Sequence, residues 1–213
     1  MLYSVKYWDA ALFVIKEKCA ENFLLKTIIY RTNSAIGRGI RGRENVRVQW
    51  NRNSKLSYTP QFLTLDNTPW FPLMGEIHYS RVSNGRWEEE LYKMKAGGIE
   101  LVSAYTIWIH HEEVEGEWDF SGDRDLRKFL QTIKNCGLHC ILRIGPWAHG
   151  EVRNGGFPDW LMQKEKEGKL VTRTNDPEYL RYVREFYGKI AEQARGLLLS
   201  DDGPVVMIQI ENE

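Results

Sequence analysis

The sequence is short of cysteine, of net charge and of long apolar runs, and each shortage excludes a class of protein. Its 213 residues include three cysteines, Cys19, Cys136 and Cys140, too few and too odd in number for a disulfide framework, so we expect buried free thiols. The 29 basic and 29 acidic residues balance, which gives no reason to expect a nucleic acid or an anionic membrane as partner. No apolar run approaches the ~20 residues that a membrane-spanning helix needs.

The first 56 residues differ in pattern from the rest, and we interpret 1–56 as an unassigned extension that is disordered or translated from upstream of the true start. They lack hydrophobic periodicity, and their second half is basic and glycine-rich. Residues 1–15 carry Lys6 and Asp9 inside their apolar stretch and no small-residue cleavage pattern, so a secretory signal is not evident and the compartment stays open. An arm that binds nucleic acid or phosphate is the alternative interpretation of the basic segment.

Aromatic side chains are what the sequence has in excess. Eight tryptophans and ten tyrosines accompany a composition otherwise ordinary for a soluble globular protein, 42% hydrophobic and 27% charged. Tryptophan fills hydrophobic cores, and it also stacks on the faces of sugar rings. Core filling is the default role of any single tryptophan, so the excess becomes informative only where aromatic residues gather at a site.

The final stretch of the chain carries the candidate chemistry. Five of the six residues in 205–210 are apolar, which predicts a strand buried on both faces of a parallel sheet. Because side chains alternate along a strand, the even-numbered residues from Val206 to Ile210 are predicted to face the helices and the odd-numbered residues from Met207 to Glu213 the opposite way. In a β/α barrel the second set would point inward and end in two carboxylates, Glu211 and Glu213, at the C-terminal end of the strand, where barrel active sites lie.

Alternating strand and helix patterns precede that strand from residue 57 onward. A hairpin is predicted first, with its turn at Asp66-Asn67. The further expected elements are strands over 73–80, 99–108 and 140–144, and helices over 86–96, from an Asp123 cap to Gly137, near 158–166, and from Asp176-Pro177 onward.

This order predicts four parallel strands joined by right-handed crossovers, which is half of a TIM (β/α)8 barrel. We therefore predict an α/β fold, a TIM barrel truncated after about the fourth strand. Residues 57–213 would form the N-terminal half of the barrel, and roughly as many residues again would lie beyond Glu213.

The predicted C-terminal ends of the four strands gather polar and aromatic side chains. Aromatic rings stack on sugars, amides and hydroxyls bond sugar hydroxyl groups, and paired carboxyls carry out acid and base chemistry. A single carboxylate at a strand end is by default a solvated group, but four such ends together favour a sugar site. The residues are His78 and Tyr79; Tyr105 and Trp108; Trp147, His149 and Glu151; and Glu211, Asn212 and Glu213.

Six motifs stand in order along residues 58–213. They are Gly75-Glu-Ile-His-Tyr-Ser-Arg81, Trp87 with Met94-Lys-Ala96, Asp119-Phe-Ser-Gly122, Leu142-Arg-Ile-Gly-Pro146, Gly155-Gly-Phe-Pro158 and Gln209-Ile-Glu-Asn-Glu213. In this combination they resemble the motif set of glycoside hydrolase family 35, the β-galactosidases of the retaining TIM-barrel clan.

The resemblance implies a retaining β-glycosidase, foremost a β-galactosidase that hydrolyses terminal non-reducing β-D-galactosyl residues without a cofactor or metal ion. Glu213 matches the family's general acid/base, Asn212 and Glu151 match residues that bond galactose hydroxyls, and Tyr79 matches a sugar-contacting tyrosine. The nucleophile, a glutamate at the end of the seventh strand, would lie beyond Glu213. The resemblance also implies a β-galactoside or related oligosaccharide as partner and a secreted, periplasmic or lysosomal location.

Two departures from the family pattern lie beside the implied sugar site. Ile109 stands where the family has asparagine, and Glu113 where it has proline. Residues 147–151 read Trp-Ala-His-Gly-Glu, where the family has an aromatic residue followed by Ile-Cys-Ala-Glu. These departures bear on the preference for galactose rather than on β-glycosidase chemistry.

Two other functions stay open. His78, His110, His111 and His149, with nearby glutamates, could serve a metal-dependent barrel hydrolase, although the adjacent His110 and His111 would point to opposite sides of an extended chain. A non-catalytic glycan-binding relative would keep the same strand ends and lack a carboxylate. Metal analysis separates the first from a glycosidase, and the identity of the nucleophile decides the second.

Overall fold

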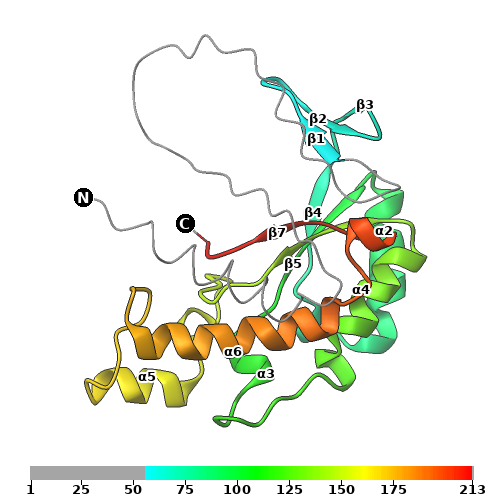
Figure 1. Ribbon diagram of the computed structural model, residues 1–213. Helices are drawn as coiled ribbons and strands as arrows, with labels where there is room; N and C mark the ends of the chain where they lie inside the picture. Colours follow the sequence, from blue (N-terminus) through cyan, green and yellow to red (C-terminus); the bar gives the residue numbers. More distant parts are fainter. Residues whose placement is uncertain (1–55, 213) are drawn as a thin grey trace.

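The computed structural model describes residues 56–212, which form two β-sheets and a set of helices (Figure 1). A three-stranded antiparallel sheet, β1-β2-β3, precedes a four-stranded parallel sheet, β4-β5-β6-β7. The predicted extension up to residue 55 and the predicted acid/base Glu213 lie outside the described residues. The α/β class and the parallel sheet are confirmed, while the TIM barrel truncated after about the fourth strand stays a prediction.

The strands are β1 (Leu56–Tyr58), β2 (Leu63–Leu65), β3 (Thr68–Trp70), β4 (Met74–Glu76), β5 (Leu101–Tyr105), β6 (His139–Arg143) and β7 (Val205–Gln209). The α-helices are α2 (Trp87–Ala96), α3 (Trp108–His111), α4 (Leu126–Asn135), α5 (Asp159–Lys166) and α6 (Pro177–Ala194). Short 3-10 turns are η1 (Tyr79–Arg81), η2 (Asn84–Arg86), η3 (Gly122–Arg124), η4 (Arg153–Gly156) and η5 (Leu199–Asp201).

The predicted hairpin is present and has a further strand. Strands β2 and β3 pair across a turn at Asp66 and Asn67, whose φ angles of 51° and 66° suit the tight turns that favour these residues. Strand β1 pairs with β2 and was not predicted. It starts at Leu56, one residue before the predicted boundary, because this buried leucine packs against Trp70 and anchors the strand.

Two of the predicted parallel strands are shorter than expected. The first ends at Glu76, after which the chain enters η1, and the second ends at Tyr105, before α3 begins. These early ends turn two aromatic residues, Tyr79 and Trp108, away from the strand direction and into the core, where both are 0% exposed. Large aromatic rings stabilise the fold most when they are buried, so local burial outweighs extension of the strand.

Helix boundaries follow local capping chemistry. At α6, the Asp176 carboxylate accepts hydrogen bonds from the backbone N–H groups of Glu178 and Tyr179 at 2.9 and 3.0 Å, as predicted. At α4 the predicted cap Asp123 is wrong. Residues 122–124 first make the turn η3, and the carboxylate of Asp125 instead accepts from the Lys128 N–H at 2.8 Å. Among residues 56–212, no helix has the length and apolar character needed to cross a membrane.

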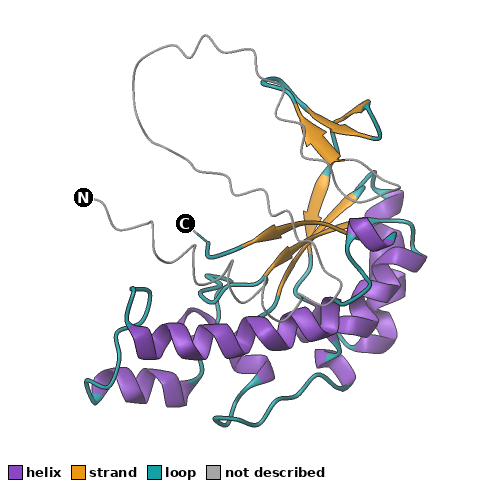
Figure 2. Cartoon of the chain, viewed as in Figure 1, coloured by secondary structure: helices purple, strands orange, loops and turns teal. Residues whose placement is uncertain are grey.

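The helices pack on one side of the parallel sheet (Figure 2). That face and the helices form the main core, which contains Val102, Cys140 and Leu142 from the strands. Cys136 and Cys140 are buried free thiols, as predicted, and Cys19 lies outside the described residues. The thiol of Cys140 is fully buried, and its burial raises the pKa above the ordinary range of a cysteine.

The opposite face of the sheet changes character along the strands. Towards their N-terminal ends Leu101, Ile141 and Val206 form an apolar cluster with Leu56 and Trp70 of the small sheet. Towards the C-terminal ends the side chains of the same face become polar. The small sheet therefore covers the part of this face near the N-terminal ends of the strands. The polar part lies at the C-terminal ends, where parallel strands carry active sites.

A bulge interrupts the predicted alternation in β7, so the prediction that Val206 faces the helices is wrong. Cys140 pairs with Val205, but the next residue, Ile141, pairs with Met207, so Val206 is the extra residue. Val205 then packs with the helices, whereas Val206 packs with Met207 on the opposite face. Beyond the bulge the prediction is confirmed for Ile208, which lies against the main core.

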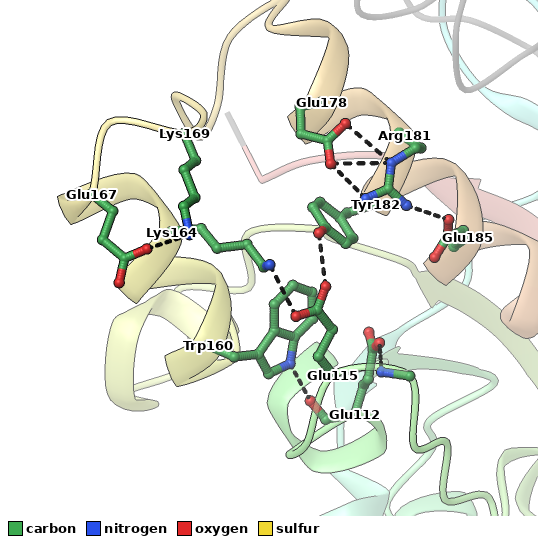
Figure 3. Close-up of polar contacts among 11 residues, drawn as sticks. Glu112, Glu115, Trp160, Lys164, Glu167, Lys169, Glu178, Arg181, Tyr182 and Glu185 are labelled. Carbon is green, nitrogen blue, oxygen red and sulfur yellow. Dashed lines mark hydrogen bonds and ion pairs between the residues drawn. The ribbon is translucent and has the colours of Figure 1, made fainter.

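A polar brace, made of Glu115, Lys164 and Tyr182, ties the loop after α3 to α5 and α6 (Figure 3). Glu115 accepts from the Tyr182 hydroxyl at 2.7 Å and pairs with Lys164 at 3.0 Å. Beside the brace, Trp160 Nε1 donates to the backbone carbonyl of Glu112 at 3.1 Å. The long connection between β6 and α6 is thus fixed to the body of the fold on its outer side.

Candidate active site

The guanidinium of Arg143 lies at the centre of the polar strand ends. One of its terminal nitrogens pairs with the carboxylate of Glu76, and the other donates to the side-chain oxygen of Asn212. The guanidinium carbon lies 3.7 Å from the centroid of the Tyr105 ring, a cation–π contact. Arg143 thereby connects the ends of β4, β5 and β7.

Glu76 is held as an anion. Its carboxylate accepts from Ser103 Oγ at 3.0 Å, lies 3.0 Å from His78 Nε2 and pairs with Arg143. Partial burial raises the pKa of the Glu76 carboxyl, but the hydrogen bonds from His78 and Ser103 and the charge of Arg143 outweigh it, and the pKa lies below its usual range.

Asn212 is fixed from three directions. Its side-chain oxygen accepts from the Tyr105 hydroxyl and from Arg143, and its backbone N–H donates to Glu211 Oε2 at 3.0 Å. Burial raises the pKa of the Tyr105 phenol, and although Arg143 opposes this shift, the phenol stays a donor at neutral pH. The amide predicted to bond the sugar therefore has little freedom to rotate.

Glu211 lies in the left-handed region, with φ 58°, and connects the strand end to the loop that follows β6. Its Oε2 lies 3.4 Å from a terminal nitrogen of Arg173, whose guanidinium carbon is 4.8 Å from the Trp147 ring centroid. Its Oε1 is buried and has no hydrogen-bond partner within residues 56–212. The contacts of Glu211 are with the protein's own backbone and loop, which fits a supporting role.

Glu151 lies beside the cluster on an exposed turn. Arg81 donates to the Glu151 backbone carbonyl at 3.3 Å, and a Cβ atom at Gly150 would lie 2.8 Å from the His78 ring, so this turn packs directly on His78. Glu151 itself is exposed, with φ 44°. The turn that carries Glu151 thus lies beside His78, whose ring bonds Glu76.

Tyr79 does not share this location. Its ring is 0% exposed, stacks on Phe129 with centroids 4.9 Å apart, and its hydroxyl lies 2.6 Å from His111 Nε2. Trp108 is equally buried and stacks on Phe186 at 4.7 Å. The burial of both rings fits core residues and not sugar contacts.

The histidines are separated by the fold. His111 lies in the core against Tyr79, His110 lies 2.8 Å from Ser80 Oγ, and His78 bonds Glu76. Within residues 56–212 no three His, Cys, Asp or Glu side chains come together in a way that could hold a metal ion. His110 and His111 lie in the helix α3, so the extended chain on which their predicted opposite directions depended is not present.

Arg143, Glu76 and Ser103 were not predicted as site residues. The sequence contains a signal for two of them: Ser103 is a polar residue inside an apolar strand and Arg143 is a charged residue that ends one, both on the face opposite the helices. What brings them together is the register between strands, Glu76 opposite Ser103 and Tyr105 opposite Arg143, and a single sequence does not fix that register.

The chain is similar in sequence to known proteins over most of its length. The sequence profile described as "Glycosyl hydrolases family 35" matches residues 62–213. "Beta-galactosidase" of Mus musculus is 37% identical over 162 residues, 76% of this chain and 25% of that protein. "Beta-galactosidase" of Xanthomonas manihotis is 36% identical over 148 residues, 70% of this chain and 24% of that protein.

A solved structure, the β-galactosidase from the psychrophilic Marinomonas ef1, aligns with 20% identity and a TM-score of 0.49, over 67% of this chain and 22% of that chain. The chain spans about a quarter of the length of the curated relatives it matches. The profile match covers most of the sequence and all four strands of the parallel sheet, and the chain therefore belongs to glycosyl hydrolase family 35.

Proposed function

We propose that the full-length protein is a retaining β-galactosidase that removes terminal β-D-galactosyl residues, and that this chain supplies the first half of its TIM barrel. The observation that carries the proposal is the cluster of Glu76, Arg143 and Asn212 at the C-terminal ends of β4, β6 and β7, within a chain of family 35. Polar groups at the carboxyl ends of barrel strands are where barrel enzymes bind and convert their substrates.

In this proposal Glu213 is the general acid/base, and the nucleophile is a carboxylate beyond Glu213. Asn212 and Glu151 bond hydroxyl groups of the sugar. Support for Asn212 comes from its fixed amide, and support for Glu151 from its exposed carboxylate beside the same strand ends. The burial of Tyr79 leaves that residue out of the proposed sugar contacts.

The reaction has two steps. First the nucleophilic carboxylate, ~5 Å from Glu213 as in retaining enzymes, attacks the anomeric carbon while Glu213 gives its proton to the glycosidic oxygen, and the bond to the leaving group breaks. Water then attacks the anomeric carbon of the glycosyl-enzyme, ionised Glu213 takes a proton from the water, and the ester bond to the nucleophile breaks. Galactose leaves with its anomeric configuration retained.

The first prediction tests Glu213 in the full-length protein. Glu213→Ala should slow the hydrolysis of β-galactosides with poor leaving groups by about 10²–10⁴-fold, because these need protonation, and slow substrates with good leaving groups much less in the first step. Azide should restore turnover of the good substrates, because this anion attacks the glycosyl-enzyme without a general base. Steady-state rates with aryl galactosides of graded leaving-group pKa measure both effects.

Glu211→Ala is the matched control, since it removes a carboxylate from the same strand end. We expect Glu211→Ala to lower the hydrolysis rates of all substrates by a similar factor. Azide should not raise these rates. Azide rescue of the Glu211 variant in place of the Glu213 variant would reverse the assignment. A wild-type protein that binds galactosides and hydrolyses none would be the non-catalytic glycan-binding relative.

A further inference from the structure

We infer that Arg143 is a positioning residue that fixes the side-chain amide of Asn212 so that Asn212 meets its ligand only as a hydrogen-bond donor. This inference rests on the proposed sugar site and adds the direction of one of its hydrogen bonds. It also gives a function to an arginine that the proposed reaction does not otherwise use.

The direction follows from which groups face the amide. An arginine guanidinium has donors and no acceptor, so the end of the Asn212 amide that faces Arg143 must be the oxygen. The same oxygen accepts from the Tyr105 hydroxyl, so both of its lone pairs are occupied. None of residues 56–212 accepts a hydrogen bond from the Asn212 amide nitrogen, and its two N–H groups are what the residue can offer a ligand.

Arg143 is itself held in one orientation. The Glu76 carboxylate pairs with one arm of the guanidinium, and the Tyr105 ring covers its face at 3.7 Å. A planar fork can satisfy Glu76, Asn212 and the ring at once, whereas a lysine offers a single nitrogen and no plane. The chain of contacts therefore runs from Glu76 through Arg143 to Asn212.

The ligand group that meets Asn212 must then accept a hydrogen bond. The oxygen of a sugar hydroxyl or of the sugar ring meets this requirement, while a group that can only donate, such as an ammonium, does not. A galactoside that carries an ammonium group at the contacted position should bind worse than its hydroxyl counterpart, although Glu76 and Glu151 supply negative charge nearby.

A double-mutant cycle in the full-length protein tests the coupling. Arg143→Lys and Asn212→Ala should each lower kcat/KM for β-galactosides by about 10- to 100-fold, the range of one lost hydrogen bond that leaves its buried partner unpaired. The double variant should lose no more than Asn212→Ala alone, because Arg143 acts through Asn212. Losses that multiply would overturn the inference.

Two further variants sharpen the test. Asn212→Asp keeps oxygens for Arg143 and Tyr105 and removes both N–H donors, so its kcat/KM should fall as far as that of Asn212→Ala. Full activity of Asn212→Asp would overturn the donor assignment. Arg124→Lys is the control, because Arg124 also pairs with a carboxylate, that of Asp119 at 2.6 Å, away from the strand ends. We expect its kinetics to match the wild type.

A structural measurement separates this inference from the proposed function. Crystal structures of the full-length wild type and of Arg143→Lys should show the Asn212 amide bonded to Arg143 and Tyr105 in the first and displaced in the second. An amide that keeps its place in the variant would overturn the positioning role, whatever the activity. A wild type with this geometry and no hydrolysis of any galactoside would overturn the proposed function alone.

Discussion

His111 illustrates how burial sets the charge of one side chain. Its Nδ1 lies 2.8 Å from the backbone carbonyl of Asp119, which can only accept, so Nδ1 carries the proton of the neutral ring. Its Nε2 then accepts from the Tyr79 hydroxyl at 2.6 Å. Burial is the main cause that lowers the pKa of His111 to about 4, and the carbonyl of Asp119 only partly opposes it.

The second prediction is a loss of stability in acid that depends on His111. An unfolded histidine has a pKa of about 6.5, so between pH ~6.5 and ~4 the unfolded chain binds a proton that the native state does not. The unfolding free energy should therefore have its full value above pH ~6.5 and fall by up to about 3 kcal/mol as the pH drops to ~4. Urea denaturation of the full-length protein at a series of pH values measures this slope.

His111→Gln is the comparison variant. It should be less stable than the wild type at pH 7, because its fit to Asp119 and Tyr79 is imperfect, but its stability should fall less between pH 6.5 and 4. The buried carboxyl of Glu112, whose pKa burial raises, acts in the opposite direction in both proteins and cancels in the difference. Equal slopes in the two proteins would remove His111 as the cause.

A motif names candidate site residues in the sequence, whereas residues that a strand register brings together have no such signal. Asn212 and Glu151 were expected from the family resemblance: Asn212 lies at the strand ends, the turn of Glu151 packs on His78, and the sugar-binding role of both stays a prediction. Tyr79 carries the same kind of motif signal, yet the turn η1 sends its ring into the core. Arg143 joins Glu76, Tyr105 and Asn212, but these partners come from strands whose pairing the sequence does not reveal.

The sequence predicts well where several helices begin. The starts of α2, α5 and α6 lie within about a residue of their predicted positions, because an apolar stripe and, at α6, an aspartate cap followed by proline are local signals. The turn η1 and the short helix α3 were missed, because each replaces the end of a predicted strand where burial of an aromatic ring decides the path.

The third prediction concerns the cap of α6. Asp176→Ala removes the acceptor of two backbone N–H groups and should cost the first turn of the helix about 1 kcal/mol. That cost corresponds to about a fivefold faster hydrogen exchange of the amides near Glu178 and Tyr179, where exchange proceeds by local opening. Mass-spectrometric hydrogen exchange of the full-length protein measures it.

In Asp176→Asn the same amides should exchange nearly as fast as in the wild type, because asparagine caps a helix as well as aspartate. The two variants remove the same charge from the first turn, so a loss seen equally in both would assign the effect to the helix dipole rather than to the hydrogen bonds.

The described part of the molecule has unpaired strand edges and an exposed apolar stretch. Strands β4 and β7 each have one neighbour among the described strands, and unpaired strand edges promote association. Phe71 and Leu73, between the two sheets, and Met74, at the start of β4, are 69%, 61% and 55% exposed. Such a contiguous apolar stretch is unusual on the surface of a monomer.

The fourth prediction is that residues 1–213 expressed alone will not form a stable, active monomer. The open edges and the exposed apolar stretch should drive aggregation, whereas the full-length protein should be soluble. Size-exclusion chromatography with light scattering, followed by thermal unfolding, measures this. A soluble monomer of the 213 residues with a cooperative transition would contradict it.

The bulge at Val206 constrains the number of residues in β7 as well as their identity. Every residue beyond it, including Gln209, owes its face to that one extra residue, since a shift of one position exchanges the two faces of a strand. A substitution at Val206 changes packing only where it occurs, but a deletion there would rotate the whole tip by half a turn and send Asn212 away from Arg143. Length in this strand is therefore under tighter constraint than identity, and variation among functional homologues should take the form of exchanged residues and not of gained or lost ones.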